Sequence, residues 1–326
     1  MPALRRALQR HWFSLGLLAA AASTLLDPSG ILVGMGNWLG SRHIPEVCVA
    51  AMFLLSGLAL DARIARKGIT DLPTFGGALA VIFIAAPLLA AAHVAALPLP
   101  GGLAVGLVLV GAMPTTLSSG VIMAQRAGGN PATALMITLS ASGLAILTIP
   151  PVLELLLGTT AAATTAVIDK PALALRLATL VLAPLAIGLV ARTALGRIGV
   201  AVPAGINHCN LALVLVVVWI ALSRSHNTLQ QAPRTVLIAG LLATSFHGLL
   251  LAVAALTARC LGLGPGRRET VWLLGAQKTL PVALLLQTAL FPEYGDALVF
   301  CVVHHVLHLS ADGILANHTS PLPKAR

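Results

Sequence analysis

Charged residues are scarce in this chain, and their scarcity excludes a soluble globular protein. Asp, Glu, Lys and Arg make up only 9% of the 326 residues, whereas about a quarter of an ordinary soluble domain is charged. Hydrophobic residues make up 58%, and the mean hydropathy is +0.95. No hydrophilic stretch is long enough to form a separate soluble domain. We therefore expect residues 1–326 to form one integral membrane domain, with the lipid bilayer as a partner.

Several motifs are also absent, and each absence argues against a class of function. The four cysteines show no CxxC spacing and lie in or beside apolar runs, which is typical of small packing residues. A nucleotide-binding motif is missing, which argues against ATP-driven pumping within this chain. No convincing nucleophile and base pair is visible. The sequence therefore predicts no enzyme activity, no cofactor and no metal.

The excess of basic residues follows a topological rule and does not form a nucleic-acid-binding patch. The formal net charge is +10. With a cytoplasmic amino terminus, 14 Lys and Arg residues fall on the inner side and 5 on the outer side, in agreement with the positive-inside rule. The inner residues are Arg5, Arg6, Arg10, Arg63, Arg66, Lys67, Arg126, Arg192, Arg197, Arg259, Arg267, Arg268, Lys324 and Arg326. The outer residues are Arg42, Lys170, Arg176, Arg224 and Arg234. We expect both termini in the cytoplasm and no nucleic-acid partner.

Ten apolar runs bounded by charges or by Pro and Gly predict an all-α membrane protein with ten transmembrane helices. The runs cover residues 11–26, 45–61, 73–96, 101–125, 131–157, 171–191, 203–223, 235–258, 269–291 and 295–317. The most polar connection, residues 159–170, splits them five and five. The two halves are then approximately 11–158 and 171–317. An odd number of helices in each half gives the halves inverted topology.

Two helix-breaking segments interrupt the fourth run of each half. The first is PTTLSSG, from Pro114 to Gly120, and the second is GAQKTLP, from Gly275 to Pro281. A break at mid-depth frees backbone groups to which ions and substrates can bind, and inverted halves should bring both breaks together near the midplane. The candidate substrate- or ion-binding residues are Thr115, Thr116, Ser118, Ser119, Thr138, Gln277, Lys278 and Thr279. The alternative for each hydroxyl is helix packing or a bond to its own helix.

Lys278 belongs to neither membrane surface. Placing an ammonium near the bilayer centre costs at least about 2.5 kcal/mol, so a lysine there is a candidate functional residue. One alternative is that its long side chain reaches an interface, but Lys278 lies nine residues from Glu269 and further still from Glu293. The other alternative is a fixed partner within the core. The carboxylates expected at membrane depth, Asp312 and Glu154, are distant in the sequence.

Three residues of the last run form a second constellation. His304, His308 and Asp312 are spaced four apart and share one helix face, with His305 beside them. This spacing suits a proton relay or a metal site. The HxxxH pair lacks the adjacent glutamate of an HExxH motif, so we predict no metal and keep a proton relay as the hypothesis. Histidines that satisfy hydrogen bonds within the core are the alternative.

Two long segments carry a family resemblance. GAMPTTLSSGVIMAQRAGGNPATALMITLSASG at 111–143 and ETVWLLGAQKTLPVALLLQTALFP at 269–292 resemble the bile acid:sodium symporter superfamily. The nearest branch is the SBF-like one, which includes solute carrier family 10 member 7 and bacterial homologues. The resemblance implies a panel domain and a core domain, with the fourth and ninth helices broken and crossed in the core.

The resemblance also implies a cation site, which this chain matches only in part. Ser119, Thr138 and Gln277 match the serine, threonine and glutamine of the sodium-coupled members. Other ligands are replaced: Gly120 stands in place of an asparagine, Leu273 in place of a glutamate and Lys278 in place of a second asparagine. The site has lost its anionic ligand and gained a positive charge.

Three hypotheses of function follow. The first is a secondary transporter that moves a small organic, anionic solute by alternating access, with Lys278 in place of sodium. The second is a sodium-coupled symporter that uses Ser119, Thr138, Gln277 and backbone carbonyls. The third is a membrane regulator of ion homeostasis that transports nothing. The sequence does not identify the solute, the coupling ion or the oligomeric state.

Overall fold

The secondary structure of the described part of the chain is helical, and the helices are joined by non-helical connections. The computed structural model describes residues 2–60, 70–117, 119–158, 168–203, 205–231 and 233–319. The elements are α1 (Pro2–Leu25), α2 (Ile31–Gly40), α3 (Ile44–Ala59), α5 (Leu72–Ala80), the π-helical turn η2 (Val81–Ala85), α6 (Ala86–Ala96), α7 (Gly101–Ala112), α8 (Ser119–Arg126), α9 (Pro131–Leu157), α10 (Lys170–Leu177), the π-helical turn η4 (Ala178–Leu182), α11 (Ala183–Arg197), α12 (Ile206–Arg224), α13 (His226–Gln231), α14 (Pro233–Cys260), α15 (Arg267–Ala276), α16 (Leu280–Leu290) and α17 (Gly295–Thr319). The prediction of an all-α protein is confirmed.

Several of these helices are long and apolar enough to cross a bilayer, so the protein is a multi-pass membrane protein. Within the described residues there are seven such spans, or eight if α2 and α3, which meet at a bend of 72°, count as one. Leu15–Leu25 of α1 and Gly101–Ala112, which is α7, are shorter apolar helices at the positions of the first and fourth predicted runs. The ten-span, inverted arrangement therefore stays a prediction. Helix α2 falls between two predicted runs and was not expected from the sequence.

Short polar caps start three of the spans. The side chains of Asp71, Asn130 and Asp169 accept hydrogen bonds from backbone amides in the first turns of α5, α9 and α10. Each of these helices also has a proline at its first or second position, where the missing N–H costs no helical hydrogen bond. The sequence encodes the start of these helices locally, through an Asp or Asn followed closely by Pro.

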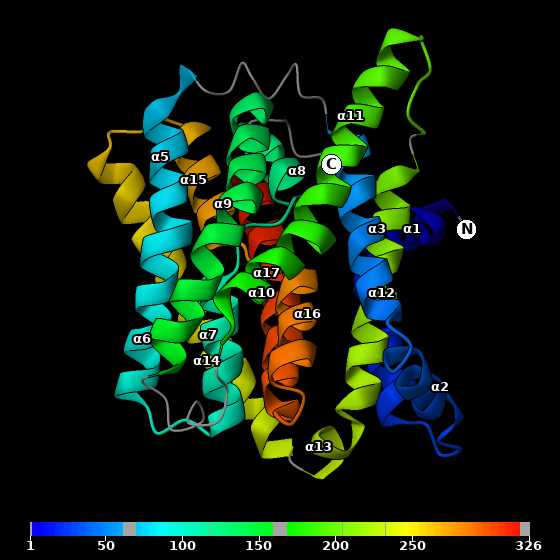
Figure 1. Ribbon diagram of the computed structural model, residues 1–326. Coiled ribbons are helices and arrows are strands. Elements are labelled where there is room, and N and C mark those ends of the chain that lie inside the picture. Colours follow the sequence, from blue (N-terminus) through cyan, green and yellow to red (C-terminus); the bar gives the residue numbers. More distant parts are fainter. Residues whose placement is uncertain are drawn as a thin grey trace.

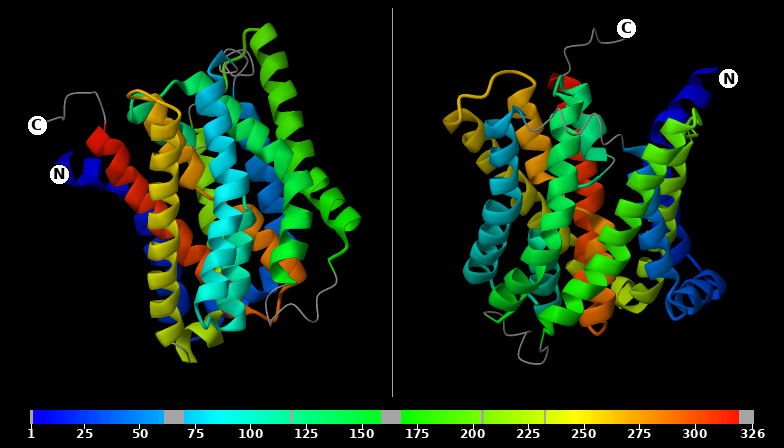
Figure 2. Two further views of the ribbon diagram at one scale, coloured as in Figure 1. Left: turned by 90° about the vertical axis from the view of Figure 1, so that its left-hand side faces the viewer. Right: turned by 45° about the horizontal axis from the view of Figure 1, so that its top comes forward.

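The described helices form two groups, which Figure 1 shows on opposite sides of the molecule. In the first helix group, α3 packs against α11 and α12, and α12 also packs against α1 and α2. In the second helix group, α14 packs against α15 and α17, α17 against α7, and α15 against α5. The right-hand view in Figure 2 shows the separation of α1, α3 and α12 from the second group.

Glycines allow the closest helix contact in the first group. A Cβ atom added to Gly57 of α3 or to Gly188 of α11 would collide with backbone atoms of the opposite helix. Small residues at such crossings let two membrane helices approach closely.

Cys48 and Cys301 are buried as expected of packing residues, whereas Cys209 and Cys260 are exposed.

Candidate functional site

The two predicted breaks are present, and a hydrogen bond joins them. Helix α7 ends at Ala112 and α8 begins at Ser119, whereas α15 ends at Ala276 and α16 begins at Leu280. The backbone amide of Thr279 donates to the carbonyl of Pro114 at 2.9 Å. The unwound segments are shorter than the predicted motifs, because Gly120, Gly275 and Pro281 lie inside helices. Pro281 occupies the first turn of α16, and Gly275 makes room for Val81 of η2.

Lys278 is buried between the breaks, and its ammonium group bonds to backbone carbonyls. Only 2% of the residue is exposed. Its Nζ donates to the carbonyl oxygen of Met113 at 3.0 Å and to that of Ile82 at 3.1 Å. Among the described residues no carboxylate lies within ion-pair distance of this nitrogen. The structure therefore contains the alternative of fixed partners within the core, and these partners are two backbone carbonyls and not a carboxylate.

Both carbonyls are available because the helices that carry them are irregular at those points. Met113 follows the last residue of α7 in an extended conformation. In η2 the amide of Ala86 bonds to Val81, five residues back, and the next residue, Pro87, has no N–H. The carbonyl of Ile82 therefore lacks both its α-helical and its π-helical donor. Lys278 satisfies that carbonyl from the unwound segment between α15 and α16, and a buried backbone group in a membrane requires such a partner.

Gln277 is the centre of a hydrogen-bonded cluster of hydroxyl groups. Its Oε1 accepts from Thr116 Oγ1 at 2.6 Å and lies 3.5 Å from Ser119 Oγ, while its Nε2 donates to the sulfur of Met123. Ser119 and the amide of Gly120 both donate to Thr116 Oγ1, at 2.8 and 3.0 Å. A Cβ added to Gly120 would lie 3.1 Å from Gln277 Oε1 and 2.7 Å from Leu274. A side chain in place of Gly120 would therefore displace this cluster.

The remaining predicted site residues are placed less closely together. Thr138 is buried in α9 and donates to Leu135 of its own helix. Thr115 is buried, and its hydroxyl has no hydrogen-bond partner among the described residues. Leu273 is fully buried against Ala127 and Ala316, so the position that matches a family glutamate is apolar. Ser118 lies outside the described residues.

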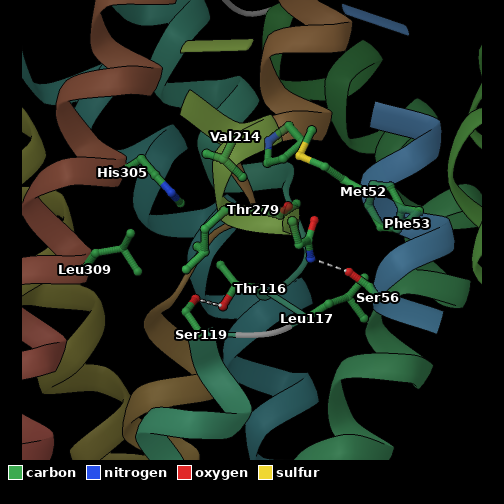
Figure 3. Close-up of a pocket in the computed structure, with 13 residues that line it drawn as sticks. Met52, Phe53, Ser56, Thr116, Leu117, Ser119, Val214, Thr279, His305 and Leu309 are labelled. Atoms are coloured by element: carbon green, nitrogen blue, oxygen red, sulfur yellow. Dashed lines mark hydrogen bonds between the residues drawn. The ribbon is translucent and has the colours of Figure 1, made fainter. Parts of the chain in front are cut away.

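A pocket lies between the two helix groups and is bordered by both breaks (Figure 3). Its empty volume is about 520 Å³, counting the open mouth. Thr116, Ser119 and Thr279 line one side. The lining from the first helix group includes Ser56 of α3 and Asn210 of α12, joined by a hydrogen bond of 2.8 Å, and the lining from α17 includes His305. The side chain of Lys278 is not part of the lining.

A second, larger cavity lies beside the first. Its empty volume is about 2180 Å³, again with open space included, and apolar residues of α1, α12 and α17 form most of its walls. Ser119 borders both cavities. Arg126, at the end of α8, also lines this larger cavity.

The histidines of α17 form a buried cluster with a histidine of another helix, α14. His304, His308 and Asp312 are buried, and Asp312 Oδ1 lies 3.1 Å from Nε2 of His247 in α14. His308 Nε2 lies 3.0 Å from His305 Nδ1. In the described part of the chain, no three His, Cys, Asp or Glu residues are arranged to hold a metal ion.

Sequence reasoning missed several residues of the site. His247 of α14 bonds to Asp312, and nothing in the sequence links it to the histidines of α17. Asn210 and Ser56 were not singled out, although a polar asparagine within an apolar run is a usable signal. The carbonyl of Ile82 had a signal too, since Pro87 stands five residues later within an uninterrupted apolar run.

Known proteins resemble this chain over most of its length. The sequence profile of the SBF-like CPA transporter family matches residues 11–320. "Probable sodium/metabolite cotransporter BASS4, chloroplastic" of Oryza sativa subsp. indica is 28% identical over 324 residues, which cover 94% of this chain and 75% of the relative. The protein of the same name in Arabidopsis thaliana is 30% identical over 331 residues, covering 95% and 75%. "Sodium/bile acid cotransporter 7" of Xenopus tropicalis is 30% identical over 155 residues, covering 46% and 45%.

Proposed function

Because the chain belongs to the SBF-like CPA transporter family, we propose that it moves a small organic anion by alternating access, with Lys278 in place of a sodium ion. The family and the named relatives are transporters, so the chain is a membrane transporter and not an enzyme. The identity of the solute class and the role of the lysine are the parts that we propose.

The position of Lys278 is the observation that carries the proposal. Its ammonium bonds to two backbone carbonyls, from the first break and from η2. Carbonyl oxygens are hard ligands that also suit a sodium ion. A covalently attached ammonium that occupies them stays with the protein, so transport would not need sodium to complete the fold of the breaks.

Two half-helices support an anionic solute. Helix α8 begins at Ser119 and α16 begins directly after Thr279, and both residues line the pocket. The dipole at a helix start favours negative charge. The buried ammonium of Lys278 adds a positive charge behind the same wall. An anion in the pocket would therefore be stabilised without a direct contact to the lysine.

The place of the pocket supports alternating access. It is lined by α3 and α12 of the first helix group and by both breaks and α17 on the other side. A movement of one group against the other would open the pocket to either side in turn. We propose that the halves 11–158 and 171–317 are the inverted repeats behind this movement.

A sodium-coupled symporter is the second candidate. The relatives are named sodium cotransporters, and Ser119 and Gln277 present oxygen atoms within one cluster. In this alternative the ion would bind at these oxygens and Lys278 would only hold the breaks together.

Solute flux in proteoliposomes separates the candidates. A panel of two- to six-carbon mono- and dicarboxylates is first screened for thermal stabilisation of the purified protein, because a ligand of the folded state raises its stability. Uptake of the stabilising compounds is then measured with and without sodium. We expect uptake in the wild type without sodium, and its loss in Lys278→Met, which keeps the length of the side chain and removes the charge.

Variants with matched chemistry complete the test. Lys278→Arg should restore little, because a planar guanidinium is larger and donates in a fixed fork. The control is Lys170→Met, which removes an exposed lysine paired with Glu154 and should leave uptake unchanged. Uptake that requires sodium in the wild type would favour the symporter. Stabilisation by a solute with no flux under any condition would favour a regulator of ion homeostasis.

A further inference from the structure

A chain of titratable side chains leads from the pocket into the core of the second helix group. His305 lines the pocket and is labelled in Figure 3. Its Nδ1 lies 3.0 Å from His308 Nε2, His308 Nδ1 lies 3.6 Å from Asp312 Oδ2, and Asp312 Oδ1 lies 3.1 Å from His247 Nε2. The first three residues follow each other at spacings of three and four on α17, so they share one helix face.

We propose that His305, His308, Asp312 and His247 bind and release one proton that couples to transport through the pocket. This inference rests on the proposed transport function and adds the coupling ion. It departs from the sequence hypothesis in two respects: His305 is the entry point, and His247 of α14 is a member. The ring of His304 contacts those of His247 and His308, but His304 makes none of the contacts that link His305, His308, Asp312 and His247.

Two buried atoms of the cluster lie opposite each other at a distance that one proton can bridge. Asp312 Oδ2 and His308 Nδ1 face each other, both are buried, and neither has a hydrogen-bond partner among the described residues. With one proton between them, the histidine nitrogen donates and the carboxylate accepts. When the cluster takes up one more proton, the proton between the two atoms can pass to Asp312 Oδ2, so that the carboxyl group becomes neutral and donates to the histidine nitrogen. The pair therefore has one arrangement with a charged carboxylate and one with a neutral carboxyl group, and burial makes the two differ in energy.

Proton transfer along this chain needs no other reactant. A proton taken up from the pocket by His305 Nε2 is followed by release of the Nδ1 proton to His308 Nε2. His308 then passes its Nδ1 proton to Asp312 Oδ2. The uptake step breaks an O–H bond of water in the pocket and forms an N–H bond on His305. Each later step breaks one N–H bond and forms one N–H or O–H bond, and the reverse sequence returns the proton to the pocket.

The surroundings of His308 connect the chain to the breaks. The backbone carbonyl of Lys278 faces His305 and His308. Other titratable groups near His308 are His304 on the same helix and His247 on α14. Helices α7 and α16, which also pack on α17, carry no titratable side chain. Arg126 of α8 lines the larger cavity, and His208 of α12 stacks on Trp12 of α1. A change of proton occupancy thus acts on the segment that carries Lys278.

The test measures proton coupling separately from transport. The carboxylate that gives the highest uptake in the panel is used in proteoliposomes without sodium. Its exchange at equal pH on both sides reports on transport itself, and its accumulation under a gradient of one pH unit reports on coupling. A monocarboxylate that moves together with one proton accumulates about tenfold for each pH unit, so a monocarboxylate of the panel is used. In Asp312→Asn and in His308→Gln, the concentration of the solute inside relative to that outside should fall to about one. Exchange at equal pH should continue.

A matched histidine provides the control. His93→Gln removes a buried histidine that bonds to Ser245 and does not belong to the group of His305, His308, Asp312 and His247. This variant should keep the tenfold accumulation. Wild-type exchange without accumulation would overturn this inference and leave the transport function in place. If the wild type exchanges none of the panel, proton binding is measured directly. On acidification from pH 8 to pH 5, each purified wild-type molecule should bind about one proton more than each molecule of Asp312→Asn. Binding of equal numbers of protons by the two proteins would overturn the inference.

Discussion

Thr116 uses its full hydrogen-bonding capacity at the first break. Its hydroxyl donates to Gln277 and accepts from Ser119 and from the amide of Gly120. A hydroxyl has one proton to donate and two lone pairs, so no capacity remains for a further ligand. Thr116 therefore serves to fix Gln277 and the start of α8, whereas Ser119, which borders both cavities, is better placed to meet a solute.

We expect Thr116→Val to destabilise the protein and to slow transport. The substitution keeps the shape and removes the hydroxyl, which leaves Gln277 Oε1 with only the 3.5 Å contact to Ser119. Hydrogen bonds between membrane helices are worth about 0.6 kcal/mol on average and about 1.7 kcal/mol at most. Because three bonds are lost at once, we expect a loss near the upper figure, measured as the shift of the unfolding equilibrium in detergent.

The matched control for Thr116 is Thr148→Val. The hydroxyl of Thr148 is exposed and bonds only to Leu144 of its own helix, so the substitution should change stability little. An equal loss of stability in both variants would show that the bond to Gln277 is not important.

At the scale of the helix, the π-helical turn η2 decides whether Lys278 has a second acceptor. We expect Pro87→Ala to restore an N–H that can bond to a carbonyl within the helix, and so to compete with Lys278 for Ile82. Sodium-independent uptake should fall several-fold while the protein stays folded. Uptake in proteoliposomes, with size-exclusion behaviour as a check of folding, measures the effect.

The chain offers a close control for this substitution. Pro184 follows the second π-helical turn, η4, in the same Ala-Pro sequence, but no lysine bonds to that turn among the described residues. Pro184→Ala should leave uptake nearly unchanged. Equal effects of the two substitutions would mean that the proline itself, and not the freed carbonyl, matters.

The start of α5 has a contact that depends on pH. Arg267 of α15 donates to both oxygens of Asp71, at 2.6 and 2.9 Å. Partial burial acts to raise the pKa of Asp71, but the hydrogen bonds from Arg267 and Thr74 outweigh it and hold the pKa below its usual value. The folded protein thus binds this proton less readily than the unfolded chain. The stabilisation is therefore complete above the unfolded pKa of about 3.9 and is lost as the pH falls through the folded value.

We expect Asp71→Asn to lower the thermal midpoint at pH 7 and to have less effect at pH 3. Asp169→Asn is the control, because the described contact of Asp169 is a cap bond to the backbone that asparagine can also make. It should change the midpoint little at either pH. A deficit of Asp71→Asn that persists unchanged at pH 3 would contradict the assignment.

At the scale of the whole molecule, the distribution of basic residues predicts the orientation in the membrane. The excess of 14 inner over 5 outer Lys and Arg residues predicts that both termini and residues 63–67 lie in the cytoplasm and that residues 159–170 lie outside. Residues 63–67 and most of 159–170 lie outside the described residues, so labelling must decide. Single cysteines are placed in these segments of a cysteine-free protein and reacted with a membrane-impermeant reagent. Labelling of 159–170 from the cytoplasmic side would contradict the topology.

The sequence by itself determined the fold class and the position of the breaks. Apolar runs of sufficient length can only cross a bilayer as helices, because their backbone groups have no other partners there. Local signals also decide where helices start and stop. Asp71 and Asn130, with the prolines that follow them, start helices, and Pro114 and Gly275 lie close to the breaks. These effects act within a few residues and can be read without knowledge of the rest of the chain.

Only the tertiary structure decided which groups meet. The carbonyl of Ile82 reaches Lys278 across 196 positions, and His247 reaches Asp312 across 65. No pattern in one sequence predicts such pairs, because they depend on how the helices pack and not on the residues between them. The same holds for Leu273, which packs against α8 and α17. Helix formation in a membrane is a local necessity, whereas the partner of a buried lysine or carboxylate is set by the packing of distant helices.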